Sequence, residues 1–104
     1  MVVVPFPFSD LTQAKRRPAL VLATLAGDDV ILCQITSQAV RDRYSVALAP
    51  ADFGSGSLPK DSNIRPNRLF MADRGILLYK VGTTCLSKLL EVVQQVVGIL
   101  QLEA

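Results

Sequence analysis

Short apolar runs separated by polar, turn-forming stretches make up most of the chain. The runs are rich in Val, Ile and Leu and have the length of strands, so they predict a β-rich fold. Residues 7–16, which are mostly polar, and residues 50–63, which are dense in Gly, Ser, Asp and Pro, are expected to be loops. The expected strands span residues 2–6, 19–25, 30–36, 44–48, 64–71 and 77–81.

The stretch Gly27-Asp28-Asp29 predicts a hairpin turn between the second and third of these runs. In the antiparallel register that such a turn sets, Thr36 returns close to Pro18 and Arg17. Pro18 is expected at the start of its strand, where a residue without an N–H interrupts no ladder hydrogen bond. The hairpin therefore predicts an arginine and a threonine at one end of the sheet.

The last segment has the spacing of an amphipathic helix. Val92 and Ile99 fall outside the main apolar stripe and widen it, and Thr83 or Thr84 is the expected N-cap. Strands in hairpins followed by one helix predict a single domain, residues 1–104, that is mainly β with a C-terminal helix. We expect a small barrel or strongly curled sheet with the helix packed on it. The stripe contains residues 86, 89, 90, 93, 96, 97 and 100.

Composition narrows the possible functions. The chain has 104 residues, of which 50% are hydrophobic and 19% charged, so it can form a core. No stretch approaches the ~20 apolar residues of a membrane span, and Cys33 and Cys85 are expected to be buried thiols of a cytoplasmic protein. The chain has no histidine, which excludes Ser-His-Asp and Cys-His catalysis and His-ligated zinc. We expect no metal site and no cofactor.

Three consecutive cations, Lys15, Arg16 and Arg17, directly precede an aliphatic run. For Lys15 and Arg16, two interpretations are equally favoured. They could take part in a binding site, or they could be solvated charges that protect the strand from aggregation. Arg17 differs, because Pro18 restricts the preceding residue to an extended conformation and so fixes its direction. A positioned guanidinium is a good phosphate ligand, since its planar fork matches two phosphate oxygens.

Two further polar groups could join this arginine. Thr36, Ser37 and Gln38 end the strand that pairs with the 19–25 run, where they could bind phosphate or base edges, or simply cap the strand end. The segment 62–70 repeats the Arg-Pro pair. It is either an edge strand marked by Pro66 with arginines in water, or a second basic element of the same groove. Its candidate ligands are Arg65, Asn67 and Arg68.

Read together and in order, the motifs PFPF, KRRPALVLA, CQITSQ and SNIRPNRL resemble the MazF/PemK toxin family of type II toxin–antitoxin systems. The resemblance extends over essentially the whole chain. It implies a curled SH3-like barrel of the MazF/Kid/CcdB type, a homodimer, and metal-independent, sequence-specific cleavage of single-stranded mRNA. It also implies a cognate antitoxin whose tail occupies the RNA groove.

The resemblance implies roles for particular residues. The family's catalytic arginine and threonine fall on Arg17 and Thr36, and its second arginine falls on Arg65. Asp10 stands near the position of a glutamate found in many members, and Asn67 replaces a carboxylate that serves as base in some. The expected catalytic residues are therefore Arg17, Thr36 and Asp10, and the remaining polar residues are expected to bind RNA: Lys15, Arg16, Ser37, Gln38, Arg65, Asn67 and Arg68.

The implied reaction is attack of an RNA 2′-OH on the adjacent phosphate, giving a 2′,3′-cyclic phosphate and a 5′-OH. Arg17 would stabilise the developing charge and Thr36 would orient the phosphate. A catalytically weak or inactive module that binds RNA or antitoxin is the alternative, favoured by the missing carboxylates. A gyrase-poisoning toxin of the same fold ranks lower, because the end of the chain has no tryptophan. The short, apolar chain also predicts self-association.

Overall fold

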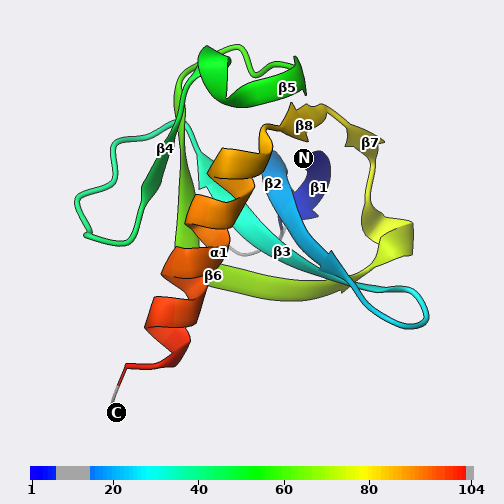
Figure 1. Ribbon diagram of the computed structural model, residues 1–104. Coiled ribbons are helices and arrows are strands. Elements are labelled where there is room, and N and C mark those ends of the chain that lie inside the picture. Colours follow the sequence, from blue (N-terminus) through cyan, green and yellow to red (C-terminus); the bar gives the residue numbers. More distant parts are fainter. Residues whose placement is uncertain (7–14, 103–104) are drawn as a thin grey trace.

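The computed structural model describes residues 1–6 and 15–102, with only the backbone for Pro5, Phe6 and Lys15. Its main element is a strongly curled, antiparallel six-stranded sheet in the order β4-β6-β3-β2-β1-β7 (Figure 1). A separate antiparallel pair joins β5 to β8, and one helix, α1, follows. The strands are β1 Val2–Phe6, β2 Lys15–Thr24, β3 Asp29–Thr36, β4 Val46–Leu48, β5 Phe53–Gly56, β6 Ser62–Asp73, β7 Tyr79–Lys80 and β8 Gly82–Thr84, and the helix is α1 Leu86–Leu100.

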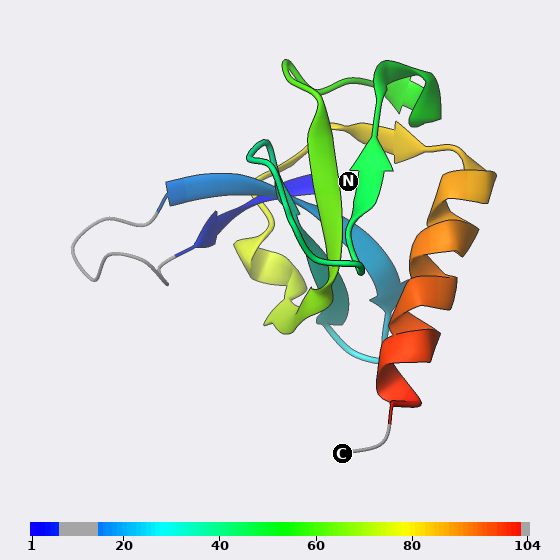
Figure 2. The ribbon, with the colours of Figure 1, turned by 90° about the vertical axis from the view of Figure 1, so that its left-hand side faces the viewer.

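The two faces of the sheet carry separate apolar clusters. On one face, α1 contributes the fully buried Val92 to a cluster that contains Leu20, Ile35 and Ile64. On the other face a smaller cluster is covered by Leu77, which lies after the short 3₁₀ helix Arg74–Ile76. The smaller cluster consists of Val4, Ala19, Val30 and Leu32. The ends of β1 and β2 project from the side of the molecule away from α1 (Figure 2).

The sequence predicted most elements at their observed positions. The strands over 2–6 and 30–36 and the helix over 86–100 are confirmed, and Gly27 adopts a φ of 80° in the predicted hairpin turn. The fold class, mainly β with a C-terminal helix, is also confirmed. In the described part of the chain the end strands β4 and β7 do not pair with each other, so the curled sheet is not closed by hydrogen bonds.

Several expected boundaries were wrong. The strand expected from residue 19 begins at Lys15, because β1 supplies a partner for residues 15–18. The expected loop 50–63 contains the 3₁₀ helix Pro50–Asp52, β5 and the start of β6. In the run 77–81 only Tyr79–Lys80 forms a strand, β7, and β8 begins beyond the run at Gly82; the run 44–48 forms strand only over Val46–Leu48.

The helix differs from the sequence expectation in its cap and its packing. Cys85, not Thr83 or Thr84, is the N-cap residue, and it makes no side-chain capping bond. Val92, expected outside the main stripe, is the buried residue of α1. Most of the expected stripe is exposed, namely Leu86, Leu90, Val93, Val97 and Leu100.

Both strand prolines occupy positions that cost few ladder bonds. Pro18 pairs with Val3 of β1, but the β2–β3 ladder begins only at Ala19, so its missing N–H leaves no partner unsatisfied on that side. Pro66 lies in a bulge, since the β3–β6 register shifts from Cys33 opposite Leu69 to Gln34 opposite Arg65. β6 runs between β4 and β3, but β4 pairs with it only over residues 62–64, so among the described residues Pro66 lies where β6 has no strand partner on the β4 side.

Candidate functional site

A polar patch covers one end of the sheet face opposite α1. Side chains alternate between faces along a strand, so Arg17 lies on the same face as the buried Ala19, two residues away. The same alternation puts Gln34 and Thr36 on the face of Leu32, and ladder pairing puts Asn63 opposite Thr36 and Arg65 opposite Gln34. The patch therefore draws its residues from three adjacent strands: Arg17 (β2), Gln34 and Thr36 (β3), and Asn63 and Arg65 (β6).

Arg17 and Thr36 face each other in register across β2 and β3. The β2–β3 ladder ends at the pair Ala19 and Gln34. Arg17 and Thr36 lie two residues beyond this pair, one on each strand. This agrees with the register expected from the hairpin turn. Arg17 is half-buried, and its backbone pairs with Val4 of β1 on the other side. The Thr36 hydroxyl accepts a 3.2 Å bond from the N–H of Gln38, which leaves its own O–H free to donate to a ligand.

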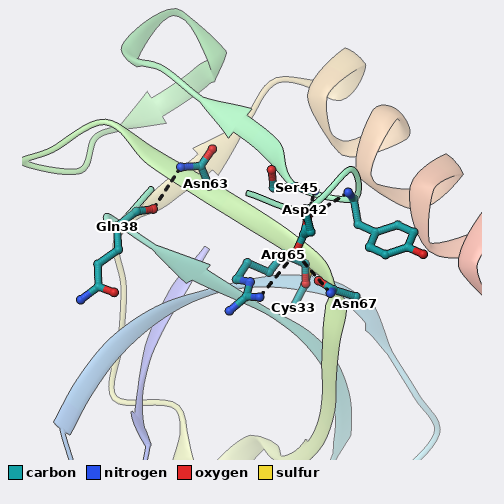
Figure 3. A network of polar contacts seen from close by, with 8 residues as sticks. Cys33, Gln38, Asp42, Ser45, Asn63, Arg65 and Asn67 are labelled. Carbon is teal, nitrogen blue, oxygen red and sulfur yellow. Dashed lines mark hydrogen bonds and ion pairs between the residues drawn. The ribbon is translucent and has the colours of Figure 1, made fainter. Parts of the chain in front are cut away.

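A carboxylate lies beside the β6 end of the patch. Asp42 Oδ2 is 3.5 Å from Nη2 of Arg65 and accepts a 3.4 Å bond from Nδ2 of Asn67. Asp42 Oδ1 accepts 2.9 Å bonds from the N–H groups of Tyr44 and Ser45. Figure 3 shows the contacts from β6 converging on this one side chain.

The environment of Asp42 favours its ionised form. Desolvation by itself raises the pKa of the carboxyl, but the hydrogen bonds from Tyr44 and Ser45, followed by those from Asn67 and Arg65, outweigh it and lower the pKa below its usual range. Asp42 is therefore an anion at neutral pH. The Arg65 and Asp42 side chains are 23% and 26% exposed, so water still reaches the pair.

Cys33 supports the bulge that carries Arg65. Its thiol donates a 2.9 Å bond to the carbonyl oxygen of Arg65, next to the register shift. Burial raises the pKa of this thiol to about 12, with the bond to Arg65 acting in the opposite direction. Cys33 is therefore a neutral structural donor, as the sequence analysis expected for a buried thiol, whereas Cys85 is only half-buried.

A pocket of about 350 Å³ opens at the same end of the sheet. Arg16 and Pro18 alternate with Arg17 along β2 and line it from the α1 side of the sheet, and Arg17 also contributes to the lining. Lys60 and Tyr79 close it from the segments that follow β5 and begin β7. Three cations thus border one cavity.

The other predicted site residues are distributed around this end of the sheet. Lys15 begins β2 opposite Phe6. Ser37 and Gln38 are exposed just beyond β3, and the Gln38 carbonyl accepts a 3.3 Å bond from Asn63. Asn67 and Arg68 are exposed in the β6 bulge. Asp10 lies outside the described residues.

Sequence reasoning missed Asp42. It lies in the segment between β3 and β4, which showed no strand or helix pattern, and its one signal was an acid flanked by Arg41 and Arg43. Within residues 1–6 and 15–102, no three His, Cys, Asp or Glu side chains gather as a metal site would require. In the same ranges, no helix is long and apolar enough to cross a membrane.

Solved structures with the same fold come from mycobacteria and from Deinococcus radiodurans. A mycobacterial endoribonuclease in complex with its cognate antitoxin superposes with a TM-score of 0.73 at 14% identity, covering 99% of this chain and 94% of that one. The Mycobacterium tuberculosis toxin MazF-mt6 gives 0.70 at 17% identity with full coverage of both chains. The MazE–MazF complex of Deinococcus radiodurans gives 0.70 at 22%, covering 98% and 91%.

No curated protein sequence matches the chain significantly. A family model does, over residues 1–100, and it describes the PemK-like, MazF-like toxins of type II toxin–antitoxin systems. The match includes every strand, α1 and the whole polar patch. The chain therefore belongs to the PemK/MazF-like toxin family of type II toxin–antitoxin systems.

Proposed function

We propose that this protein is a toxin that cleaves single-stranded mRNA by attack of a 2′-OH on the adjacent phosphate. The observation that carries the proposal is the register of Arg17 with Thr36 on an open, polar sheet face. A guanidinium and a hydroxyl on the same face of two adjacent strands can bind the oxygens of one phosphate. Family membership and the likeness to endoribonuclease folds support the same reaction class.

In the proposed step the 2′-oxygen forms a bond to phosphorus while the bond from phosphorus to the 5′-oxygen breaks. Arg17 stabilises the negative charge that develops on the non-bridging oxygens, and Thr36 donates a hydrogen bond that orients the phosphate. Arg65 adds a second positive contact from β6. The products are a 2′,3′-cyclic phosphate and a 5′-OH. The step uses no cofactor.

The step also needs a group that accepts the 2′-OH proton and a proton for the 5′-oxygen. A guanidinium has no acceptor, so Arg17 cannot be the base. We propose that Asp10, the carboxylate nearest to Arg17 in the sequence, accepts the 2′-OH proton, and that Arg17 donates a proton to the leaving 5′-oxygen. The segment between β1 and β2 joins the strand end that carries Arg17.

RNA binding is proposed to extend from the patch toward the pocket. Lys15, Arg16 and Arg68 would supply phosphate contacts, and Ser37, Gln38 and Asn67 would contact sugars or base edges. A cognate antitoxin with an acidic, partly apolar tail would compete for the same basic groove. Structures of this fold bound to an antitoxin support that partner class.

We further propose a cytoplasmic homodimer. The exposed side chains of α1 at positions 86, 90, 93, 97 and 100 follow helical spacing and form one apolar stripe. An apolar stripe of this length is typical of a surface that is covered by another subunit. Dimerisation through α1 leaves the patch, on the opposite face of the sheet, open to RNA.

A module that binds RNA or antitoxin without cleaving is the second candidate. One observation favours it: Asp42, the carboxylate beside the patch, already accepts four hydrogen bonds, so it is a poor proton acceptor. If Asp10 does not act, no described carboxylate of the patch replaces it.

Expression toxicity combined with primer-extension mapping of cut sites separates the two candidates. The nuclease yields discrete cuts with 5′-OH ends in cells that express the wild type and none in cells that express Arg17→Ala. The binding module yields no new ends. Asp10→Asn tests the base, because a variant that cleaves at the wild-type rate would remove Asp10 from that role.

A further inference from the structure

We propose that Asp42 is a positioning residue for RNA recognition, which orients the side chains of Arg65 and Asn67 and couples them to the segment between β3 and β4. The inference rests on the proposed function, because it assigns a role in the same RNA site. It concerns a residue that does not touch the reacting phosphate. Figure 3 shows the geometry from which it follows.

The acceptor capacity of Asp42 is fully used. An ionised carboxylate offers about four lone-pair sites, and Asp42 fills them with two backbone and two side-chain donors. No site remains to accept from a base or from a 2′-OH. Asp42 therefore acts on RNA through the residues it orients.

Arg65 retains the donors that Asp42 does not use. A guanidinium carries five N–H donors, and the contact to Asp42 uses one nitrogen, Nη2. The buried Nε has no hydrogen-bond partner among the described residues. The cation is thus fixed at one corner, and because Nε is buried, the donors left for a ligand are the other N–H groups at the end of this partly exposed side chain. A phosphate that lies on the patch beside Thr36 would find these donors one strand away.

The same carboxylate fixes a backbone turn. Its bonds from the N–H groups of Tyr44 and Ser45 hold the backbone of residues 42–45 in a turn. The conformation of this turn and the direction of Arg65 therefore depend on one side chain. Asn67, on the bulge of β6, reaches the same oxygen as Arg65. Asp42 thereby links the segment between β3 and β4 to two positions of β6, on either side of Pro66.

The charge of Asp42 gives the proposal a distinctive test. A carboxylate beside a phosphate-binding groove repels RNA, so its removal should strengthen binding if charge alone mattered. If Asp42 orients Arg65, its removal should weaken recognition. The two explanations predict changes of opposite sign for one substitution.

Asp42→Asn is the informative variant. The amide oxygen can still accept from Tyr44 and Ser45, whereas the amide NH₂ would confront the donors of Arg65 and Asn67. Asp28→Asn is the matched control, since it changes the net charge equally in the exposed turn between β2 and β3. The readouts are the cleavage rate of a mixed-sequence single-stranded RNA and the Kd for its 2′-O-methylated form, which cannot undergo 2′-OH attack.

We expect Asp42→Asn to lower the cleavage rate by about tenfold or more, the scale of effect seen when an orienting group is displaced, and to raise the Kd. Asp28→Asn should change neither by more than about twofold. In an Arg65→Gln/Asn67→Ala background, Asp42→Asn should have little further effect, because its partners are gone. The Arg65 Nε–H signal in NMR spectra should be sharp in the wild type and broadened in Asp42→Asn.

Unchanged or tighter RNA binding and undiminished cleavage by Asp42→Asn would overturn the proposal. So would an equal loss in the double-variant background, since Asp42 would then act without Arg65 and Asn67. A wild type that binds RNA but does not cleave it removes the nuclease function and leaves the Kd series to decide the role of Asp42. A wild type that neither binds nor cleaves overturns both proposals.

Discussion

Arg17 and Thr36 lie in register on one face of β2 and β3, two residues beyond the last paired residues of that ladder. The two side chains are distant in sequence, and the hairpin at Gly27 together with the register shift between Val21 and Ala23 brings them opposite each other. Among the described residues the β2–β3 ladder ends before them, whereas Arg17 still pairs with Val4 of β1 and Thr36 with Asn63 of β6. The register of one hairpin therefore determines the chemistry of the site.

The ionisation of Asp42 predicts a pH-dependent difference between the wild type and Asp42→Asn. The pKa of this carboxyl is lower in the folded protein than in the unfolded chain, where it is about 3.9. Its contribution to folding stability is therefore complete above the unfolded value and is lost as the pH falls through the folded value. Melting temperatures measured from pH 7 to pH 3 should show a gap in favour of the wild type at pH 7 that closes in acid. A gap independent of pH would contradict the shift.

Replacement of glycine by alanine should change the stability of the protein in opposite directions at Gly56 and Gly98. A Cβ on Gly56, whose φ is 72°, would lie 2.2 Å from the carbonyl oxygen of Val81, so Gly56→Ala should destabilise the protein by about 2 kcal/mol or more. A Cβ on Gly98 meets nothing within 4 Å in the exposed last turns of α1, so Gly98→Ala should stabilise by about 0.5–1 kcal/mol. Urea unfolding of both variants measures the difference. Equal effects would contradict the β5–β8 geometry.

The two cysteines should react at very different rates. Burial and a raised pKa make Cys33 unreactive in the folded state. The pKa of the half-buried Cys85 is lowered, chiefly by its contact with Ser87 and a backbone bond from Lys88, so more of it is thiolate near neutral pH. Titration of the native protein with a thiol reagent at pH 8 should show one fast thiol, and a second only after denaturation. Loss of the fast phase in Cys85→Ser would confirm its assignment, and two fast thiols would contradict the burial of Cys33.

The exposed stripe of α1 predicts where subunits associate. A lysine in place of Val97 introduces a charge into the proposed interface, so Val97→Lys should shift the protein from dimer to monomer at micromolar concentration. Gln95→Lys, an exposed position outside the stripe on the same helix, is the control and should remain a dimer. Sedimentation velocity distinguishes the two states. A monomeric wild type, or a Val97→Lys variant that stays dimeric, would contradict this interface.

The sequence predicted those parts of the fold that local pattern determines. The hairpin, β3 and the extent of α1 follow from turn chemistry and apolar periodicity over neighbouring residues. β2 begins earlier than its apolar run, because pairing with β1 recruits the polar residues Lys15 and Arg16 into a strand. β5 could not be predicted from a segment so rich in Gly and Ser, since it exists only by pairing with β8.

The residues of the candidate site likewise divide into those that a local sequence pattern indicates and one that only contacts in the fold reveal. Arg17, Thr36 and Arg65 could be named from the sequence, because a proline or a strand end marks each of them. Asp42 could not, since its role arises from contacts with Arg65 and Asn67, more than 20 residues away in the chain. The buried side of α1 was also misassigned. The helix has two apolar stripes, and periodicity alone cannot tell which of them faces the sheet and packs Val92.

The most direct test of the proposed function is the rate at which purified protein cleaves single-stranded RNA in the presence of EDTA. The wild type, Arg17→Ala and the control Arg74→Ala should be compared, because Arg74 is an equally charged, exposed residue near the opposite end of the sheet. We expect cleavage to 2′,3′-cyclic phosphate and 5′-OH ends by the wild type and Arg74→Ala, and a loss of about 10²-fold or more in Arg17→Ala. Circular dichroism should show that all three are equally folded. Cleavage by Arg17→Ala at the wild-type rate would contradict the assignment of Arg17 to the reacting phosphate.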